Sequence, residues 1–372
     1  MSRITTRLTA AAAVAVTTGV LAACSSSGTG DPAAPGNSAA SATAASGSTS
    51  ADVVASAPTT NAAWSKFHFV IADNGGDGTQ ALAGILGTFK DASYTVSFAR
   101  FSYGPPLVEA LAAGKADIGG VGDVPPITGA ATEFGFKIVA IERAFTQGES
   151  GEDILVKANS DIKTLADLRG KTIAVPQGSS AHGLVLLALN SAGLKPSDVK
   201  LVFLDPAAGA QAFASGQVDA WAIWNPQATL AVQDSGGRVL VYGKPPIDQD
   251  NDYYVASEAD LSNPVKRAAL ADVLERIGEE FAYAEKHPAA YAQAIEQEDD
   301  LSPADAKAYV AAEQYKIDPI EPSDIQAEQQ LSDLFFESGQ IKTEVDVASI
   351  SDNLLPAGYD SSKANISNLP ES

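Results

Sequence analysis

Two glycine-rich turns carry the residues best suited to bind a small anion. The first is Gly122-Asp123-Val124, which follows a short apolar run and precedes Pro125. Asp123 is expected to be the N-cap of a helix there, and Gly104-Pro105 begins an earlier helix in the same stretch. The first turn of a helix has N–H groups without intrahelical partners and the positive end of the helix dipole. We therefore expect these two helix N-termini to face each other and form an anion site.

The second turn is Gln177-Gly178-Ser179-Ser180, between the end of an apolar strand and the start of a helix. Ser179 or Ser180 is expected to cap that helix. Ligands of open α/β sheets bind beyond the carboxyl ends of strands, where a ligand oxygen can accept from the same N–H groups. All four residues are therefore predicted to line a cleft. His182, in the first helical turn, has either a ligand-binding or a structural role.

Trp221, Trp224 and Asn225 lie in the run GQVDAWAIWNP, which is expected to be a strand that ends near Trp224. Side chains alternate between the faces of a strand, so tryptophans three positions apart point to opposite faces. We expect Trp224, at the carboxyl end, to face a ligand and Trp221 to lie in the core. The amide of Asn225 can donate a hydrogen bond to an anion.

Strand and helix signals alternate along the chain and place these turns at strand ends. The predicted strands are 67–72, 94–100, 116–119, 137–141, 153–157, 171–176, 200–204, 217–224 and 253–257. The predicted helices between the later strands are 181–192, 207–214 and 226–233, and the chain is expected to be helical from about 258 to 338. This order predicts a parallel α/β sheet that is repeated in two halves.

The first 24 residues read as an export signal. Arg3 and Arg7 precede an apolar run over 8–23, which is too short to span about 30 Å of hydrocarbon as a helix. The sequence LAAC, which ends at Cys24, resembles a bacterial lipobox, and this implies that Cys24 is lipidated; an unlipidated signal is the alternative. Residues 24–63 are rich in Ser, Ala, Gly and Pro without apolar periodicity, which predicts a disordered tether.

Composition excludes several classes of function. Cys24 is the only cysteine of 372 residues, which excludes an intrachain disulfide, a cysteine nucleophile in the folded part and a thiolate metal site. The formal net charge of −22 becomes −24 when Arg3 and Arg7 leave with residues 1–23. So acidic a surface argues against nucleic acid as a partner. It does not forbid an anionic ligand, because exposed charges are screened beyond roughly 8 Å.

Three motifs give the folded part a family resemblance. They are GPPLVEALAAGKADIGGVGDVPP, ILVKANSDIKTLADLRGKTIAVPQGSSAHGLVLLAL and GQVDAWAIWNP. Together they resemble the substrate-binding proteins of ABC importers for aliphatic sulfonates, a group close to the taurine- and nitrate-binding ones. The resemblance extends over about residues 65–345.

This resemblance implies an α/β, two-lobed, periplasmic-binding-protein-like fold (type II), in which each lobe is a sheet flanked by helices and two strands form the hinge. The expected divisions are a lipoprotein signal peptide (1–23), a tether (24–63), a first lobe (64–146 with 248–372) and a second lobe (147–247). It also implies a monomer on the outer face of the cell membrane, or in the periplasm if an outer membrane exists. The protein would capture a small organic anion, an aliphatic sulfonate in the first instance, for an ABC permease in sulfur uptake.

Two departures from the family bear on the ligand. Asn225 stands where relatives commonly have Asp, which weakens the case for a taurine-like ligand. The loop around Gly76 and Asp77, which we expect to line the cleft, lacks the Tyr-Gln-Lys-like sequence of the family. Asp73 and Asp77 without further ligands do not predict a metal site, and no cofactor is expected.

Nitrate, taurine and an aromatic carboxylate or sulfonate remain alternative ligands. Some enzymes share this fold, including a sulfinate desulfinase with a cysteine nucleophile and a thiamine-pyrimidine synthase. This chain has only His68, His182 and His287, and no Gly-x-Ser-x-Gly elbow or Ser-His-Asp spacing. A binding protein is therefore preferred over an enzyme, and a purely structural or adhesive lipoprotein is the weaker alternative.

Overall fold

The computed structural model describes residues 61–75, 78–144, 151–299, 301–312 and 314–364, with 366 and 369. They belong to one compact unit, Ser56–Ser372. The predicted signal peptide, Cys24, the tether up to residue 60, Gly76 and Asp77 lie outside the described residues. The last three residues predicted to belong to the tether, 61–63, are described and lead into a short 3-10 helix, Ala62–Trp64. Within these ranges, none of the helices combines the length and the apolar character that a membrane span requires.

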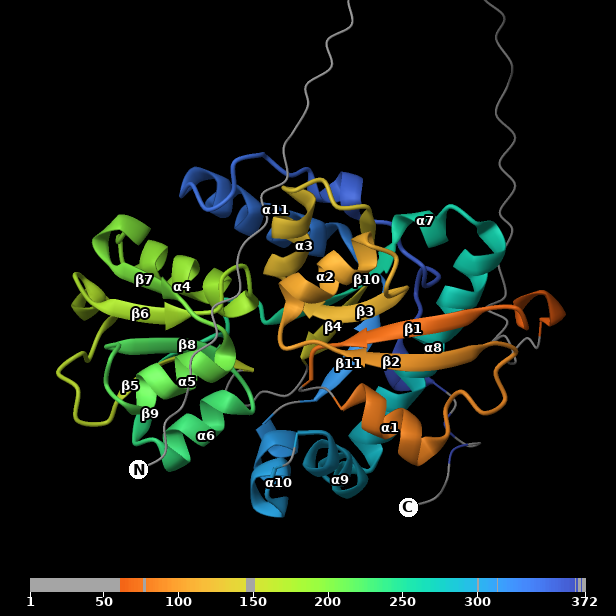
Figure 1. The fold of residues 1–372 in the computed structure, drawn as a ribbon, viewed down its shortest axis with the longest axis horizontal. Helices are drawn as coiled ribbons and strands as arrows, with labels where there is room; N and C mark the ends of the chain where they lie inside the picture. Colours follow the sequence, from red (N-terminus) through yellow and green to blue (C-terminus); the bar gives the residue numbers. More distant parts are fainter. Residues whose placement is uncertain are drawn as a thin grey trace, which may run out of the picture. The chain divides into compact units, whose positions relative to one another are not determined.

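A six-stranded sheet organises the first lobe (Figure 1). In spatial order its strands are β11 (Tyr315–Asp318), β4 (Phe136–Ala144), β10 (Asn251–Ser257), β3 (Ile118–Gly122), β1 (His68–Asp73) and β2 (Thr95–Arg100). β1 pairs parallel with β2 and β3, whereas β10 runs antiparallel to β3 and β4, and β11 runs antiparallel to β4. The prediction of a parallel sheet is therefore wrong here. The chain returns from the other lobe at the end of β3, where Asp252 pairs with Gly122, so β10 must run away from that edge.

A five-stranded sheet organises the second lobe. Its strands, in spatial order, are β7 (Lys200–Phe203), β6 (Thr172–Val175), β8 (Ala220–Trp224), β5 (Glu152–Lys157) and β9 (Gly237–Tyr242). β6 pairs parallel with β7 and β8, and β5 pairs antiparallel with β8 and β9, so this sheet is also mixed. Sequence analysis missed β9 and also β11, which interrupts the region predicted to be helical. The other strands lie within a few residues of the predicted ranges.

The helices flank these sheets. They are α1 (Thr79–Leu86), α2 (Gly104–Ala112), α3 (Val124–Ala130), α4 (Ser180–Ser191), α5 (Pro206–Ala214), α6 (Gln227–Asp234), α7 (Glu258–Leu261), α8 (Pro264–Lys286), α9 (Pro288–Asp299), α10 (Pro303–Ala312) and α11 (Pro322–Glu337). Many of them have proline in the first turn, where the missing N–H group would have no intrahelical partner.

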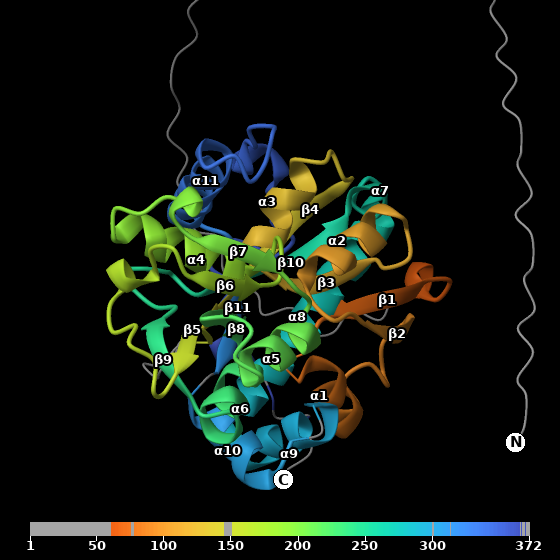
Figure 2. The same cartoon turned by 60° about the vertical axis from the view of Figure 1, so that its left-hand side comes forward.

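Alternation along the strands of the second lobe divides its core between two faces. Ile154 and Val156 pack with α4, whereas Leu155, between them, packs with α5 and α6. Figure 2 turns this lobe forward and shows α4 and α5 on opposite sides of the strands. Helices on both faces explain why β5, β6 and β8 are apolar runs.

The first lobe is built in the same way. α2, α3 and α11 cover one face of its sheet, and the long helix α8 covers the other. Leu186 of α4 joins the core on the α11 side, where Leu331 and Phe335 also lie. α4 therefore packs with both lobes, and the described connection between the sheets is the segment 243–250.

Candidate functional site

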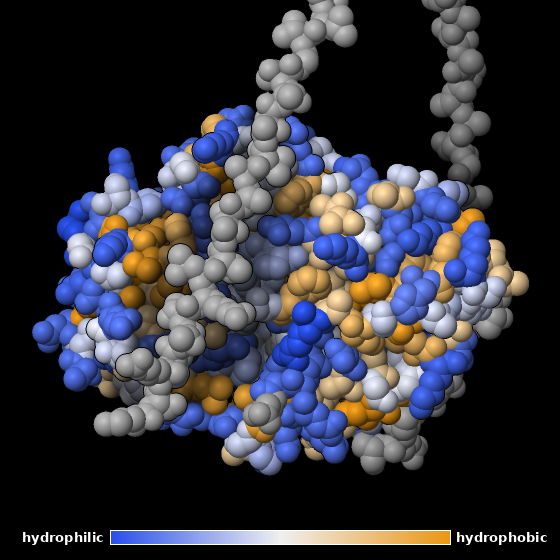
Figure 3. Space-filling view, in the orientation of Figure 1, coloured by the Kyte–Doolittle hydropathy of each residue, from blue (hydrophilic) through white to orange (hydrophobic). Residues whose placement is uncertain are grey.

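A cavity lies where the ends of β3 and β8 and the starts of β5 and β10 meet. The first lobe contributes Asn74, Gly75, Gly104, Gly120, Val121, Gly122, Asp123, Pro125, Glu142, Asn251, Asp252, Tyr309 and Tyr315. The second lobe contributes Gly151, Glu152, Ser179, Ser180, Trp224 and Asn225. The connecting segment contributes Asp248 and Asp250. Figure 3 shows a recess between the lobes whose visible floor has mostly hydrophilic colours. The cavity is thus a shared, polar site between the two sheets.

Half of the predicted ligand-binding residues line this cavity. They are Gly104, Gly122, Asp123, Ser179, Ser180, Trp224 and Asn225. Pro105, Gln177 and Gly178 lie around a separate hollow at the outer edge of α2 and α3. Gly178 has φ 73°, so the chain turns there and carries residue 177 away from the cavity.

Val124 was predicted to bind the ligand, and His182 to have either a ligand-binding or a structural role. Val124 is fully buried in the core of the first lobe, and its side chain approaches Gly183 of α4. His182 is also buried, between the rings of Phe203 and Phe335. Neither residue lines the cavity, because each points from its helix toward the packed side.

The surroundings of His182 keep its imidazole neutral. Burial lowers the pKa of His182 to about 4. Its Nδ1 accepts a hydrogen bond from the N–H of Gly178 at 3.3 Å, so His182 fixes the glycine turn before α4. The histidine therefore has a structural role and stays uncharged between pH 5.5 and 8.

Gly122 and Ser180 bring the two lobes into contact. A Cβ atom on Gly122 would lie 2.8 Å from Cβ and 2.9 Å from Oγ of Ser180, which is closer than real Cβ contacts allow. Glycine at the end of β3 therefore lets the N-terminus of α4 approach the first lobe. Ser179 is the N-cap of α4, but its hydroxyl donates to the carbonyl of Pro176 at 2.8 Å and makes no capping bond.

The two tryptophans of β8 point to opposite faces of the sheet, as the alternation of side chains along a strand requires. Trp221 is buried and packs against Phe213, with ring centroids 5.8 Å apart. Trp224 lines the cavity opposite Glu152, its partner in the antiparallel register of β5 and β8. Directly paired residues share one face of a sheet, so the indole and the carboxylate face the cavity together.

Acidic residues dominate the cavity wall, which the sequence analysis did not anticipate. Six lining residues carry a carboxyl group: Asp123, Glu142, Glu152, Asp248, Asp250 and Asp252. Strand pairing assembles several of them, because β10 places Asp252 opposite both Gly122 and Glu142. A sequence signal existed for three of them, since Asp248, Asp250 and Asp252 alternate in IDQDND, which leads into the start of β10.

The helix N-termini of the first lobe are also poorer anion sites than predicted. Pro105 and Pro106 follow Gly104 in α2, and Pro125 and Pro126 follow Val124 in α3. Proline has no N–H group, so each helix lacks two of its first-turn donors. Asp123 makes no capping hydrogen bond with its side chain. The N-terminus of α4, which has no proline, is the better anion site.

Burial makes several of these carboxyls reluctant to ionise. The pKa of Asp123 is raised well above its usual range by burial, then by Asp248, Glu328, Glu152 and Asp252. Burial likewise raises the pKa of Asp248, although backbone N–H donors to this carboxylate partly oppose the shift. The pKa of Glu152 is also raised well above its usual range, first by burial and then by Asp248. A hydrogen bond with Ser180 opposes this shift.

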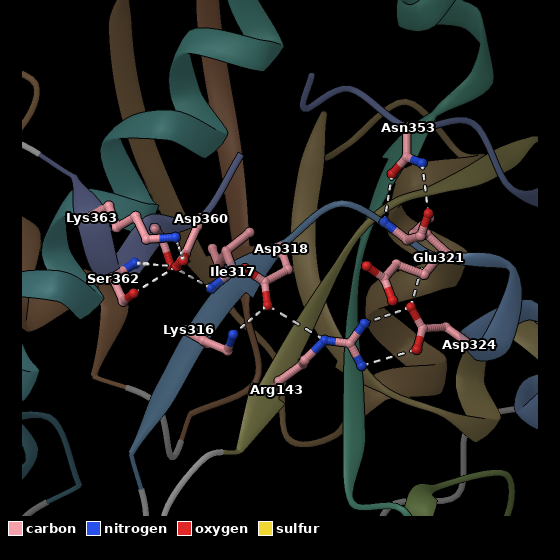
Figure 4. Close-up of polar contacts among 12 residues, drawn as sticks. Arg143, Lys316, Ile317, Asp318, Glu321, Asp324, Asn353, Asp360, Ser362 and Lys363 are labelled. Atoms are coloured by element: carbon pink, nitrogen blue, oxygen red, sulfur yellow. Dashed lines mark hydrogen bonds and ion pairs between the residues drawn. The ribbon is translucent and has the colours of Figure 1, made fainter. Parts of the chain in front are cut away.

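Arg143 and Arg100 are held by carboxylates that do not line the cavity. The Nη1 and Nη2 atoms of Arg143 donate to the two oxygens of Asp324 at 2.9 and 2.6 Å, and its Nε lies 3.5 Å from Asp318 (Figure 4). Arg100 pairs with Asp299 and donates to the carbonyl of Glu298 at 2.8 Å. No lysine, arginine or histidine is found among the described residues that line the cavity.

Asp123→Asn should raise the stability of the protein at neutral pH. The folded-state pKa of Asp123 lies above its unfolded value, so its contribution to stability is complete below about pH 4 and is lost as pH rises through the folded pKa. An amide cannot ionise, and we expect a gain of about 1–3 kcal/mol at pH 7.5, the usual cost of an unsatisfied buried polar group. Urea unfolding at pH 7.5 and pH 5 measures it, and the gain should shrink at pH 5.

Asp161→Asn is the matched control for this prediction, because Asp161 is an exposed acid outside the cavity. It should leave the free energy of unfolding nearly unchanged. A less stable Asp123→Asn protein at pH 7.5 would contradict the account of a buried, repelled carboxylate.

Comparison with known proteins agrees with this fold. Residues 83–290, more than half of the chain, match the family model described as NMT1/THI5 like. A protein of Escherichia coli (strain K12) that is named for binding aliphatic sulfonates is 34% identical over 261 residues, which cover 68% of this chain and 77% of that protein.

Two solved structures are similar over the same part of the chain. The alkanesulfonate-binding protein SsuA from Xanthomonas axonopodis pv. citri, bound to MOPS, has a TM-score of 0.70 and 29% identity, and the match covers 77% of this chain and 98% of that one. The periplasmic aliphatic sulphonate-binding protein SsuA from Escherichia coli has a TM-score of 0.67 and 31% identity, with 77% and 92% covered. These matches confirm the periplasmic-binding-protein fold, and the chain belongs to the NMT1/THI5-like family.

Proposed function

We propose that this protein is the solute-binding subunit of an ABC importer and captures an aliphatic sulfonate between its two lobes. The observation that carries the proposal is the polar cavity, which both sheets line and which the N-terminus of α4 enters at Ser179 and Ser180. The similarity to two sulfonate-binding structures over nearly their whole length supports it. The solute would then pass to a permease in the membrane.

The N-terminus of α4 suits the anionic end of such a solute. The N–H groups of Ser180 and Ala181 precede that of His182, the first to donate within the turn. A sulfonate stays ionised at physiological pH, so it needs donors but no acid or base. Micromolar affinity requires about −8 kcal/mol, while one charged hydrogen bond contributes roughly 1.5–3 kcal/mol. Several donors must therefore converge, and the indole of Trp224 can cover the carbon chain.

A binding role fits these residues better than catalysis. The proteins matched over most of this chain are named for binding. The only cysteine lies at position 24, outside the described residues, and His182 is buried with a lowered pKa. Neither a cysteine nor a histidine is among the described residues that line the cavity, so a Cys–His or Ser–His pair is not found there.

The remaining features of the proposal come from the sequence. We propose that the protein is exported, anchored by a lipid at Cys24 and monomeric, with residues 24–63 as its tether. The moving units would be a first lobe of 64–146 with 248–372 and a second lobe of 147–247, joined by two crossings. A solute that touches both lobes favours their closed arrangement by the contacts made only there.

Trp224→Ala should weaken the binding of long-chain sulfonates by about tenfold or more, because a buried aromatic side chain supplies a large apolar contact. Short sulfonates should lose less, because they cover less of the indole. Titration calorimetry of the purified protein with ethane-, butane- and octanesulfonate measures the series. Trp221→Phe is the control, since Trp221 packs in the core. Wild-type affinity of Trp224→Ala for octanesulfonate, or no binding of any sulfonate to the wild type, would contradict the proposed function.

A further inference from the structure

A second cavity is lined by α4, by α11 and by the connecting segment 243–250, and we call it the connector cavity. Its volume is about 290 Å³, near the lower limit of the roughly 300–1,000 Å³ that is typical of pockets for small organic ligands. The cavity described above, at the strand ends, is called the first cavity here. The two are distinct, although Asp123, Asp248 and Asn251 line both of them.

The connector cavity combines an apolar wall with buried acids. Its apolar side chains include Leu187, Ile247, Leu331 and Leu334. Three of its carboxyl-bearing residues, Asp123, Asp248 and Glu328, are 6%, 4% and 3% exposed. Asn190 and Gln330 also line the cavity and are exposed, so a solute can reach it from the solvent. Sites for small molecules typically pair an apolar lining with a few polar groups that fix the orientation of the ligand.

Glu328 is the acid of this group that the fold leaves without a counter-charge. It lies on the buried face of α11 with Asp324 and Leu331, where a helix normally has apolar residues. Asp324, one turn earlier, is paired with Arg143. Among the described residues, the Oε1 atom of Glu328 has no hydrogen-bond partner. Glu328 lines the connector cavity and not the first cavity, so a ligand in the connector cavity can supply the missing partner.

The neighbouring acids add to the cost of this buried carboxyl. Burial raises the pKa of Glu328 well above its usual range, a hydrogen bond with Tyr253 opposes the shift, and Asp248 adds to it. Asp248 and Glu328 both raise the pKa of Asp123 in turn. A cation placed among these acids would offset their repulsion and donate to the oxygen that lacks a partner.

The chain brings no cation of its own to these acids. No lysine, arginine or histidine is found among the described residues that line the connector cavity. Lys244, in the connecting segment, lies over the ring of Tyr242, with its Nζ atom 4.7 Å from the ring centroid. Of the residues that the structure does not describe, only Arg3 and Arg7 are basic, and both belong to the predicted signal peptide. A cation for this cavity therefore has to come from a ligand.

We propose that the connector cavity is a second binding site, which takes an alkylammonium ion. Its charged end meets Glu328, flanked by Asp123 and Asp248, and its carbon chain packs on the apolar wall. An ammonium group has three N–H donors, and hydrogen bonds between opposite charges are about twice as strong as neutral ones. The inference goes beyond solute capture, and it holds whichever solute the first cavity takes.

An organic cation fits these residues better than a metal ion. Across the described ranges, no group of three or more His, Cys, Asp or Glu side chains is arranged to hold a metal ion. The apolar wall also offers nothing to Ca²⁺ or Mg²⁺, because these ions take oxygen ligands. An alkyl chain, in contrast, is stabilised by burial against such a wall.

Titration calorimetry with the purified protein tests the site with two probes of equal length. n-Butylammonium and butan-1-ol differ in an ammonium group against a hydroxyl group. At pH 7.5 we expect n-butylammonium to bind at a single site, at least about tenfold tighter than butan-1-ol. Equal affinities of the two probes, or no saturable binding of n-butylammonium, would refute the cation site.

Three variants in which glutamine replaces glutamate locate the cation, because glutamine keeps the size of the side chain and removes its charge. Glu328→Gln should weaken the binding of n-butylammonium by about tenfold or more. Glu152→Gln removes a buried acid that lines only the first cavity, and Glu337→Gln removes an exposed acid of α11 that lines neither. Both should bind n-butylammonium within about threefold of the wild type. If Glu152→Gln weakens binding as much as Glu328→Gln, the cation lies in the first cavity and the inference is wrong.

A further variant changes the shape of the connector cavity without changing its charge. Ala327 lines the cavity from α11, and Ala327→Leu adds an isopropyl group there while leucine remains a good helix former. This variant should weaken the binding of n-butylammonium by about tenfold or more. Urea unfolding establishes that each variant is folded, and if Glu328→Gln does not fold, Ala327→Leu decides. Wild-type affinity of Ala327→Leu for n-butylammonium would overturn the inference.

Discussion

Cys24→Ala should release the protein from the cell membrane almost completely. The lipobox-like LAAC sequence implies a diacylglyceryl group on Cys24, and each buried CH₂ contributes about 0.8 kcal/mol, so two chains give stable attachment. Without residues 1–23 the formal net charge would be −24, which anionic lipids repel, so we do not expect charge to hold the protein at the membrane in place of a lipid. Cell fractionation and immunoblotting after a salt wash measure the effect.

The neighbouring substitution Ser25→Ala keeps Cys24 and should leave the protein in the membrane fraction. Intact mass of the released Cys24→Ala protein establishes whether residues 1–23 were removed. A Cys24→Ala protein that stays with the washed membranes after removal of residues 1–23 would refute the lipid anchor.

Arg143→Met should destabilise the fold by about 3 kcal/mol, because removing one partner of a buried ion pair leaves the other charge uncompensated. The side chains of Arg143 and Asp324 are 24% and 6% exposed. Asp324 also accepts a hydrogen bond from the N–H of Glu321 at 2.7 Å, so the pair fixes the start of α11 to β4. α11 packs with α4, and its loosening should weaken the contact between the lobes. Thermal and urea unfolding measure the loss.

Arg169→Met is the matched control, because Arg169 also pairs with an aspartate, Asp198, but its side chain is 59% exposed. Exposed ion pairs contribute little, so this variant should unfold close to the wild type. Arg143→Met with Asp324→Asn should recover part of the loss, since the amide leaves no buried charge. If Arg143→Met and Arg169→Met lowered the stability equally, the claim that the Arg143–Asp324 pair stabilises the fold because it is buried would be wrong.

The acidic cavity and the predicted effect of Asp123→Asn reflect one trade-off, between the stability of the fold and the retention of buried carboxyl groups at the binding site. Burial and the neighbouring acids raise the pKa of the Asp123 carboxyl, and a carboxyl with a raised pKa lowers the stability of the fold at neutral pH. Sites that bind ligands often retain such costs, because the ligand supplies the missing partner.

Local chemistry in the sequence determined much of the architecture. Prolines in the first turn mark the starts of α2, α3 and α5, and apolar runs mark β5, β6 and β8, because both signals depend only on near neighbours. The opposite orientation of Trp221 and Trp224 also follows from alternation along one strand. These signals located Gly122, Ser180 and Trp224 near the cavity.

The sequence failed where distant segments pair. β11 has four residues, two of them charged, between helices, so only its pairing with β4 makes it a strand. The antiparallel place of β10 depends on where the chain returns from the second lobe. In the sequence, only the alternation of Asp248, Asp250 and Asp252 distinguishes any acid of the cavity from the rest of the 46 acidic residues of the chain.

Only the tertiary structure decided the charge of the site. Strand register places Asp252 opposite Gly122 and Glu142, and Glu152 opposite Trp224, and burial then raises the pKa of the carboxyls near them. The spacing of turns predicts where a ligand can bind, because turns are local. The electrostatic character of that place depends on carboxyl groups from three strands (β4, β5 and β10), from the turn after β3 and from a connecting segment, and their distances exist only in the folded chain.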